Sequence, residues 1–192
     1  MKTLEQPISI VGIHTFRCYD LTSPKAKQLE ESIEEHIGMR GFMPEDQYKE
    51  QWAKFMSDLQ AYVTKEKVVK NLITTVGRSV LAQRLANTTT YTGIINYGAL
   101  GSSATAVNNS DTQLGTEVFR KVVASSSYTT NTAFIDFFYS KADTNGTYQE
   151  FGTFIDGAAG ANTGQLFTHA LTGGWVKTSS ESMTVSCQYQ IN

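Results

Sequence analysis

The stretch MTVSCQYQI (residues 183–191) alternates strictly between two kinds of side chain. Every second residue is apolar or aromatic: Met183, Val185, Cys187, Tyr189 and Ile191. The residues between them are all Thr, Ser or Gln. Successive side chains of a β-strand point to opposite faces, so the stretch predicts a strand of an antiparallel sheet with one buried and one wetted face.

Similar but shorter stretches precede it and extend the prediction to the whole second half of the chain. They are rich in aromatic and β-branched residues and predict strands at residues 91–99, 117–124, 133–140, 147–155 and 165–171. Between two of them, Asp143-Thr144-Asn145-Gly146 favours a tight hairpin, because Asn-Gly readily adopts positive φ angles. Residues 157–164 are mostly Gly and Ala and predict a flexible loop or a contact surface.

The distribution of charge changes near Asn87. Residues 1–87 contain 12 Lys/Arg and 11 Asp/Glu, whereas residues 88–192 contain 4 and 7. This change predicts an N-terminal strand plus helical region over residues 1–87, followed by a β-sandwich domain over residues 88–192. We therefore expect an α+β fold: an antiparallel β-sandwich, jelly-roll-like, with an N-terminal strand and a helical insertion.

In the first part of the chain, residues 8–19 are β-rich and predict a strand with His14, Phe16 and Cys18 on one face. A helix is then expected from Pro24 to Ile37, with Ser23 as its N-cap and Gly38 ending it. Another helix is predicted over residues 66–86. Gly77 costs such a helix about 1 kcal/mol relative to Ala, which is tolerable where another backbone packs closely.

A helix between these two begins after Pro44 and has an aromatic and apolar stripe at helical spacing. The stripe consists of Tyr48, Trp52, Phe55, Met56 and Leu59, followed by Tyr62. Two interpretations stay open: the stripe docks this helix on its own domain, or it is offered to a neighbouring subunit. In the second interpretation, the first five residues form a candidate assembly interface.

Composition argues against several classes of partner. The formal net charge of -2 and a pI near 5.9 leave no excess positive charge for nucleic acid or for an anionic membrane surface. No apolar run reaches the length of a membrane span. Cys18 and Cys187 lack C-x-x-C spacing and are interpreted as reduced, buried thiols, with a disulfide between the terminal strands as the alternative.

Sequence signatures of chemistry are missing. There is no G-x-S-x-G elbow, and His14, His36 and His169 lie in unrelated contexts. Neither H-E-x-x-H, C-x-x-C nor a phosphate-binding glycine loop occurs. We therefore expect no catalytic residue, no metal and no cofactor.

The acidic and aromatic residues scattered through the second half of the chain leave two less favoured functions open, glycosidase activity and carbohydrate binding. Asp136, Glu150 and Asp156 would serve a glycosidase only if two of them converged at roughly 5–10 Å; exposure to solvent or to a neighbour explains them better. Aromatic rings stack on sugars or fill a core. The candidates are Tyr128, Tyr148, Phe151, Phe154 and Trp175.

Five short motifs lie in order between residues 68 and 191. They are KNLI (70–73) with Gly77, ALG (99–101), LGTEVFRK (114–121), NG (145–146) with EFGTF (150–154), and VK (176–177) with Glu181 and Val185. Together with the strand that ends in Tyr19-Asp20, they resemble a widespread type of tailed-bacteriophage virion protein, a component of tail fibres, baseplates or necks. Residues 24–63 depart from that pattern, which passes quickly from the first strand to the KNLI segment.

The resemblance implies β domains that assemble into symmetric rings or trimers. The expected function is a structural component of a tailed phage virion, in the tail, baseplate or fibre-attachment region. It would be assembled in the host cytoplasm and would act by homo-oligomeric packing and by docking to other virion proteins, without enzymatic activity. The alternative is a carbohydrate- or receptor-binding module at the tail tip, in which exposed aromatics such as Trp175 contact a host glycan or receptor.

Overall fold

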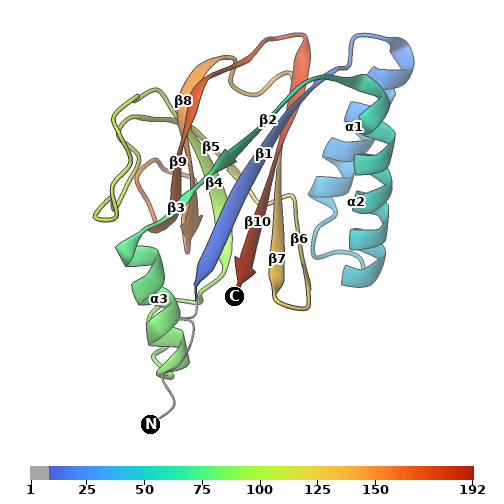
Figure 1. Cartoon of the computed structure of the whole chain (residues 1–192). Coiled ribbons are helices and arrows are strands. Elements are labelled where there is room, and N and C mark those ends of the chain that lie inside the picture. The colour runs from blue at the N-terminus through green and yellow to red at the C-terminus, as the bar shows by residue number, and fades with distance from the viewer. Residues whose placement is uncertain (1–8) are drawn as a thin grey trace.

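The computed structural model describes residues 9–192. Over this range the chain forms two five-stranded antiparallel sheets and three α-helices (Figure 1). The expected α+β class is therefore correct, with strands predominating.

The first sheet has the strand order β2-β1-β10-β7-β6. Its strands are β2 (Val63–Lys70), β1 (Ile10–Asp20), β10 (Glu181–Ile191), β7 (Thr132–Tyr139) and β6 (Ser125–Thr129). β1 and β10 pair along their whole length, from Ile10 opposite Ile191 to Asp20 opposite Glu181. Strands from the two ends of the sequence thus lie side by side within one sheet (Figure 1).

The second sheet has the strand order β3-β9-β8-β4-β5. Its strands are β3 (Leu72–Ile73), β9 (Gln165–Lys177), β8 (Gly146–Ile155), β4 (Ile95–Gly101) and β5 (Glu117–Val122). Bulges interrupt the pairing of β8 with both of its neighbours. At these points β8 and its partners slip in register, so side chains change face along the strand.

One apolar core unites the two sheets. Phe16, Phe137 and Val185 from the first sheet share it with Leu100 and Phe151 from the second. The alternation of residues 183–191 is confirmed on this side, because Met183, Val185, Cys187 and Tyr189 all belong to the core. Cys18 and Cys187 are both buried as free thiols.

Two helices cover the other face of the first sheet (Figure 1). They are α1 (Pro24–Gly38) and α2 (Glu45–Leu59), and a short 3-10 turn, η1 (Gln60–Tyr62), follows α2. The Ser23 hydroxyl accepts a hydrogen bond from the Ala26 N–H, which confirms the predicted N-cap. The prediction that the polar face of residues 183–191 is exposed to water is wrong for half of it: Thr184 is fully buried beneath this layer and Ser186 is half-buried, whereas Gln188 and Gln190 are exposed.

The helical pair is inserted into a β-hairpin. The chain leaves β1 at Asp20 and re-enters the same sheet at Val63, directly opposite Tyr19. The ends of the insertion therefore meet, and the pairing of β1 with β2 does not depend on its length.

The predicted helix over residues 66–86 is wrong in its first half. That half forms β2 and β3, and the helix is shorter, α3 (Thr75–Leu85). Residues 63–70 alternate between half-buried and exposed positions, and their β-branched valines suit a strand. The expectation for Gly77 is confirmed: a Cβ there would lie 2.8 Å from the Phe167 carbonyl oxygen, so α3 packs directly on the backbone of β9.

Five predicted strands in the second half are confirmed within a few residues, although β4 begins only at Ile95 and β9 continues to Lys177. β6 was not predicted, because SSSYT contains no apolar alternation. The N-terminal strand is also confirmed from Ile10 onward; Ile8, where it was predicted to begin, lies outside the described residues.

The predicted hairpin at Asn145-Gly146 is wrong. β7 pairs with β6 and β10, whereas β8 pairs with β4 and β9, so residues 140–145 cross from one sheet to the other. Residues 157–164 do form a loop, which connects β8 to β9. The change of composition at Asn87 does not divide the sheets. β1, β2 and β3 precede it, and each belongs to a sheet that also contains strands from after it.

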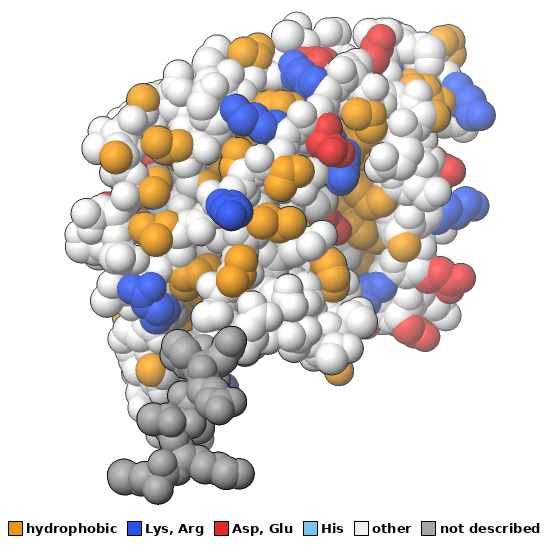
Figure 2. Space-filling view, in the orientation of Figure 1, with side chains coloured by type: hydrophobic (Ala, Val, Ile, Leu, Met, Phe, Trp, Pro, Cys, Tyr) orange, Lys and Arg blue, Asp and Glu red, His pale blue; other side chains and the backbone are white. Residues whose placement is uncertain are grey.

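β2 forms one edge of the first sheet. Over the face that β2 and β1 present, Lys and Arg side chains are interspersed with hydrophobic ones (Figure 2). Charged side chains on an edge strand oppose pairing with a strand of another molecule. This edge is therefore protected against uncontrolled association.

Candidate functional site

The aromatic stripe of α2 faces its own domain. Tyr48, Trp52, Phe55 and Leu59 are all buried, and Met56 is half-buried against the same cluster. The Tyr48 hydroxyl donates to the Ala124 carbonyl over 2.7 Å. The Trp52 indole N–H donates to the Asp136 carboxylate over 2.8 Å.

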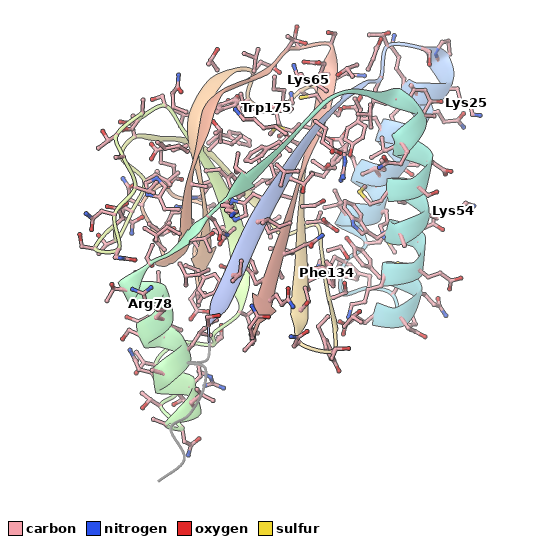
Figure 3. The ribbon with its side chains drawn as sticks, in the orientation of Figure 1. Lys25, Lys54, Lys65, Arg78, Phe134 and Trp175 are labelled. Carbon is pink, nitrogen blue, oxygen red and sulfur yellow. The ribbon has the colours of Figure 1, made fainter. Side chains whose placement is uncertain are left out.

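These contacts match the first of the two interpretations, docking on the parent domain. The five residues proposed as an assembly interface are occupied within the chain, and a neighbour would reach them only if α2 left the sheet. The outward face of α2 carries polar residues instead; Lys54, for example, points away from the sheets (Figure 3).

A buried acid fastens α1 to the sheets. Glu30 is 2 % exposed and accepts hydrogen bonds from the Ser182 hydroxyl and from the Lys141 N–H, the latter over 2.7 Å. Burial raises the pKa of Glu30, but these hydrogen bonds and the Lys141 charge outweigh it and the net pKa is lowered. Glu30 thus links α1 to β10 and to the crossing between the sheets as a carboxylate.

A second buried acid, Glu150 of β8, holds both ends of the long loop between β4 and β5. Its carboxylate accepts hydrogen bonds from the N–H groups of Ser103, Gly115 and Thr116 over 3.2, 2.9 and 2.8 Å. A Cβ on Gly101 would lie 2.4 Å from the same carboxylate. Gly101, Gly115 and Glu150 come from three different sequence motifs and meet at one point.

His169 of β9 lies between two carboxylates. Its Nε2 is 2.8 Å from Glu150 Oε2, and its Nδ1 is 2.8 Å from Asp111 Oδ2. Burial lowers the pKa of His169, but the hydrogen bonds and charges of Glu150 and Asp111 outweigh it and raise the net pKa. The pKa of Glu150 is lowered by His169 and the three backbone donors, despite the opposing effect of burial.

A buried ion pair orders the glycine-rich loop of residues 157–164. Arg120 and Glu117 of β5 pair over 2.6 Å, with side chains only 4 % and 1 % exposed. Arg120 also donates to the carbonyls of Ala158 and Thr163, and the Asn162 N–H donates to Glu117. The Arg120 guanidinium lies 4.7 Å from the centre of the Phe154 ring, a cation–π contact.

Lys177 of β9 is buried, and its ammonium donates to the Asn145 amide oxygen over 2.7 Å. Burial lowers its pKa, against the raising effect of nearby negative charge, chiefly that of Asp143. Asn145 belongs to the same motif as Glu150, and Lys177 belongs to a further one. The NG segment serves as a partner for this buried lysine rather than as a hairpin turn.

A polar cluster lies between the sheets. His14, which is fully buried, has its Nε2 2.7 Å from the Asn71 amide nitrogen and 3.3 Å from the Tyr189 hydroxyl. Burial lowers the pKa of His14 to about 3, so the ring is neutral. The Thr153 and Thr168 hydroxyls, 2.7 Å apart, complete the cluster.

The acids considered for glycosidase chemistry do not face a common cleft. Asp136 contacts Trp52 beneath the helices, Glu150 holds the β4–β5 loop, and Asp156 accepts from the Thr92 N–H. Asp111 does approach Glu150, but the His169 ring fills the space between them. Glu150 and Asp111 are therefore used to hold a loop, and no room for a sugar separates them.

The prediction of an exposed Trp175 is wrong. Its indole is only 7 % exposed, belongs to the shared core and donates to the Met183 sulfur; Figure 3 shows it beside Lys65 at one end of the sheets. Of the aromatics considered for sugar stacking, Tyr128 is the exposed one, at 80 %. Tyr148, Phe151 and Phe154 are core residues.

Asp111, Glu117 and Arg120 are among the residues of these networks that were not predicted as functional. The available signal was the motif LGTEVFRK, which contains Glu117 and Arg120 three residues apart on a strand. Asp111 carries no local signal. Its partner His169 is 58 residues away in the sequence, and only the fold brings them together.

Within residues 9–192, no group of three or more His, Cys, Asp or Glu side chains is arranged to hold a metal ion. In the same range no helix combines the length and apolar character needed to cross a bilayer. Comparisons of the chain with protein-family models, with curated proteins and with solved structures give no match.

Proposed function

We propose that this chain is a structural component of a tailed phage virion, in the tail, baseplate or fibre-attachment region, and that it acts by oligomeric assembly and docking to other virion proteins. One observation carries the proposal. Residues of the separate motifs that resemble such proteins meet in space: Gly101 and Gly115 with Glu150, and Asn145 with Lys177. Their common role is to hold loops and the connection between the two sheets in place, which is consistent with a structural protein.

The shared core between the two sheets favours a β-sandwich. Hairpins such as β6–β7 and β8–β9 pair consecutive strands within one sheet. That order favours a sandwich built from hairpins over a jelly-roll sandwich, in which consecutive strands mostly alternate between the two sheets.

Exposed apolar side chains gather where the two sheets open. A groove of about 400 Å³ lies there, and among residues 9–192 those that line it include no Asp, Glu, Lys or Arg. At its rim Ile94, Tyr128 and Ile191 are 65 %, 80 % and 52 % exposed. Exposed apolar groups of this kind are typical of protein–protein contacts, which supports assembly.

Light scattering over a range of concentrations tests the proposal. We expect a discrete oligomer that Ile94→Lys dissociates. Val68→Lys is the matched control, since Val68 is 54 % exposed on β2, at an edge away from the groove. If the wild type stays monomeric at every concentration, as the Ile94→Lys variant does, the result contradicts assembly through copies of this chain.

The alternative, a carbohydrate- or receptor-binding module, now depends on Tyr128 instead of Trp175. A glycan array with the wild type and with Tyr128→Ala distinguishes the two proposals. Binding that Tyr128→Ala abolishes, from a monomer, favours the module; no binding leaves the assembly role as the better explanation.

A further inference from the structure

The loop of residues 102–116 covers the outer face of the second sheet. Its Leu114 packs with Ala99, Phe154 and Leu166, and Glu150 holds its two ends. The tip is fastened separately: Asp111 Oδ2 contacts both His169 Nδ1 and the Asn108 N–H, the latter over 2.7 Å. The ends and the tip therefore depend on two different acids joined through one imidazole.

The two acids differ in their access to water. The Glu150 side chain is 1 % exposed, whereas that of Asp111 is 24 % exposed. An imidazolium donates from both nitrogens, but a neutral ring donates from only one. A buried carboxylate that loses a donor has no water to replace it. The neutral ring therefore keeps its proton on Nε2 for Glu150, and its Nδ1 lone pair then faces the Asp111 carboxylate.

We propose that His169 is a proton-operated latch for the loop of residues 102–116. When the imidazolium loses its proton, the tip at Asp111 separates from β9 and is solvated, while Glu150 continues to hold both ends. The conformational change is thus confined to one side of the loop.

Among the described residues, two charged groups contact His169. Asp111 faces it from the loop and Glu150 from β8, and its partner in β3 is the uncharged Leu72. From α3, Arg78 contacts Asn109 on the loop, and the Thr75 N–H donates to the Asn109 carbonyl over 2.8 Å. These α3 contacts do not involve His169, so they persist and set the limit of the movement.

The direction of the switch follows from the two carboxylates. They hold the pKa of His169 above its ordinary value of 6.5. The latch is therefore closed at pH 6.5 and opens as the pH rises through the raised pKa. This behaviour is independent of the proposed virion function.

Nitrogen-15 NMR of the histidine rings in the full chain, recorded over a pH series, tests the latch without any variant. We expect His169 to be doubly protonated at low pH and to become the Nε2–H tautomer through a midpoint above 6.5. The amide signals of Asn108 and Ser110 should move with the same midpoint. Those of Gly115 and Thr116 should not.

Asp111→Asn is the matched variant, because it removes one charge at a partly exposed position and leaves Glu150 in place. We expect it to lower the midpoint of His169 and to remove the pH response of Asn108 and Ser110. Two results would overturn the proposal: a neutral His169 with its proton on Nδ1, or amide signals of Asn108 and Ser110 that do not change as His169 titrates. So would an unchanged midpoint in Asp111→Asn.

Discussion

The stability of the folded protein depends on pH through two groups, Glu150 on the acidic side and His169 on the alkaline side. Glu150 has a lowered pKa, so its stabilising contribution is complete above its unfolded value of 4.5 and is lost as the pH falls through the folded value. His169 has a raised pKa, so its contribution is complete below 6.5 and is lost as the pH rises through the folded value. Both contributions are complete only between pH 4.5 and 6.5.

We therefore expect the free energy of unfolding of the wild type, minus that of His169→Gln, to be largest in this interval. Chemical denaturation at a series of pH values measures the difference. On the alkaline side it should shrink, because glutamine does not titrate. A difference that stays constant from pH 5 to pH 10 would show that His169 gains nothing from its charge.

At the residue scale, single positions were predictable where the chemistry is local. Ser23 was predicted as an N-cap because it acts on its own turn of helix. Gly77 was predicted as a close contact because glycine is costly within a helix unless another backbone packs against it. The Asp111–His169–Glu150 network was not predictable. Each of its members is unremarkable in its own segment, and their convergence depends on the pairing of β8 with β9 and on the path of a loop.

At the scale of elements, α3 depends on the missing side chain at Gly77. We expect Gly77→Ala to destabilise the protein by about 1–3 kcal/mol, because its Cβ would lie 2.8 Å from a backbone oxygen of β9. Gly38→Ala, also in a helix, meets nothing within 4 Å and should be neutral or slightly stabilising. Thermal unfolding of both variants measures the contrast, and equal effects would contradict close packing at Gly77.

The docking of α2 gives a second prediction at this scale. Trp52→Ala removes a buried ring and leaves Asp136 without its indole donor, so we expect a loss of about 3–5 kcal/mol. Lys54→Ala on the outward face should change stability by less than about 0.5 kcal/mol. Denaturant unfolding compares them. If Trp52→Ala is folded and stable but fails to assemble, the aromatic stripe of α2 is instead an assembly interface.

Elements with a clean period were predictable, and those without one were not. The stripe of α2 and the alternation of β10 gave the correct type and nearly the correct bounds. The segment of residues 63–73 was misread because its lysines and valines suit either a helix or an edge strand. β6 was missed because serine-rich strands are stabilised by their neighbours rather than by their own sequence.

For the whole molecule, the helical pair is part of the fold. Removing residues 24–63 would leave Tyr19, Leu21 and Phe138 uncovered. The chain can still be rejoined, because the hydroxyl of Thr64, the first residue retained, lies 3.2 Å from the Cys18 carbonyl oxygen of β1. We expect this deletion to lower the unfolding temperature, to bind a hydrophobic dye and to aggregate. Phe42→Ser, at an 82 % exposed position in the α1–α2 turn, is the control and should change none of these three properties.

A deletion variant that stays monodisperse with an unchanged unfolding temperature would show that the helices are dispensable. Architecture at this scale was only partly predictable from the sequence. The charge change at Asn87 indicated the two structural classes correctly, but it did not mark a boundary, since β1 and β2 lie before it and complete a sheet made of later strands. Pairing between distant strands leaves no trace in composition.

The antiparallel pairing of β1 with β10 has a mechanical consequence. The Ser9 and Asn192 backbones are hydrogen-bonded to each other at one end of this pair, so a pull applied between these residues loads the ladder one rung at a time. Rungs broken in succession resist far less than rungs sheared together. A tether through both residues would make β1–β10 the point that yields first.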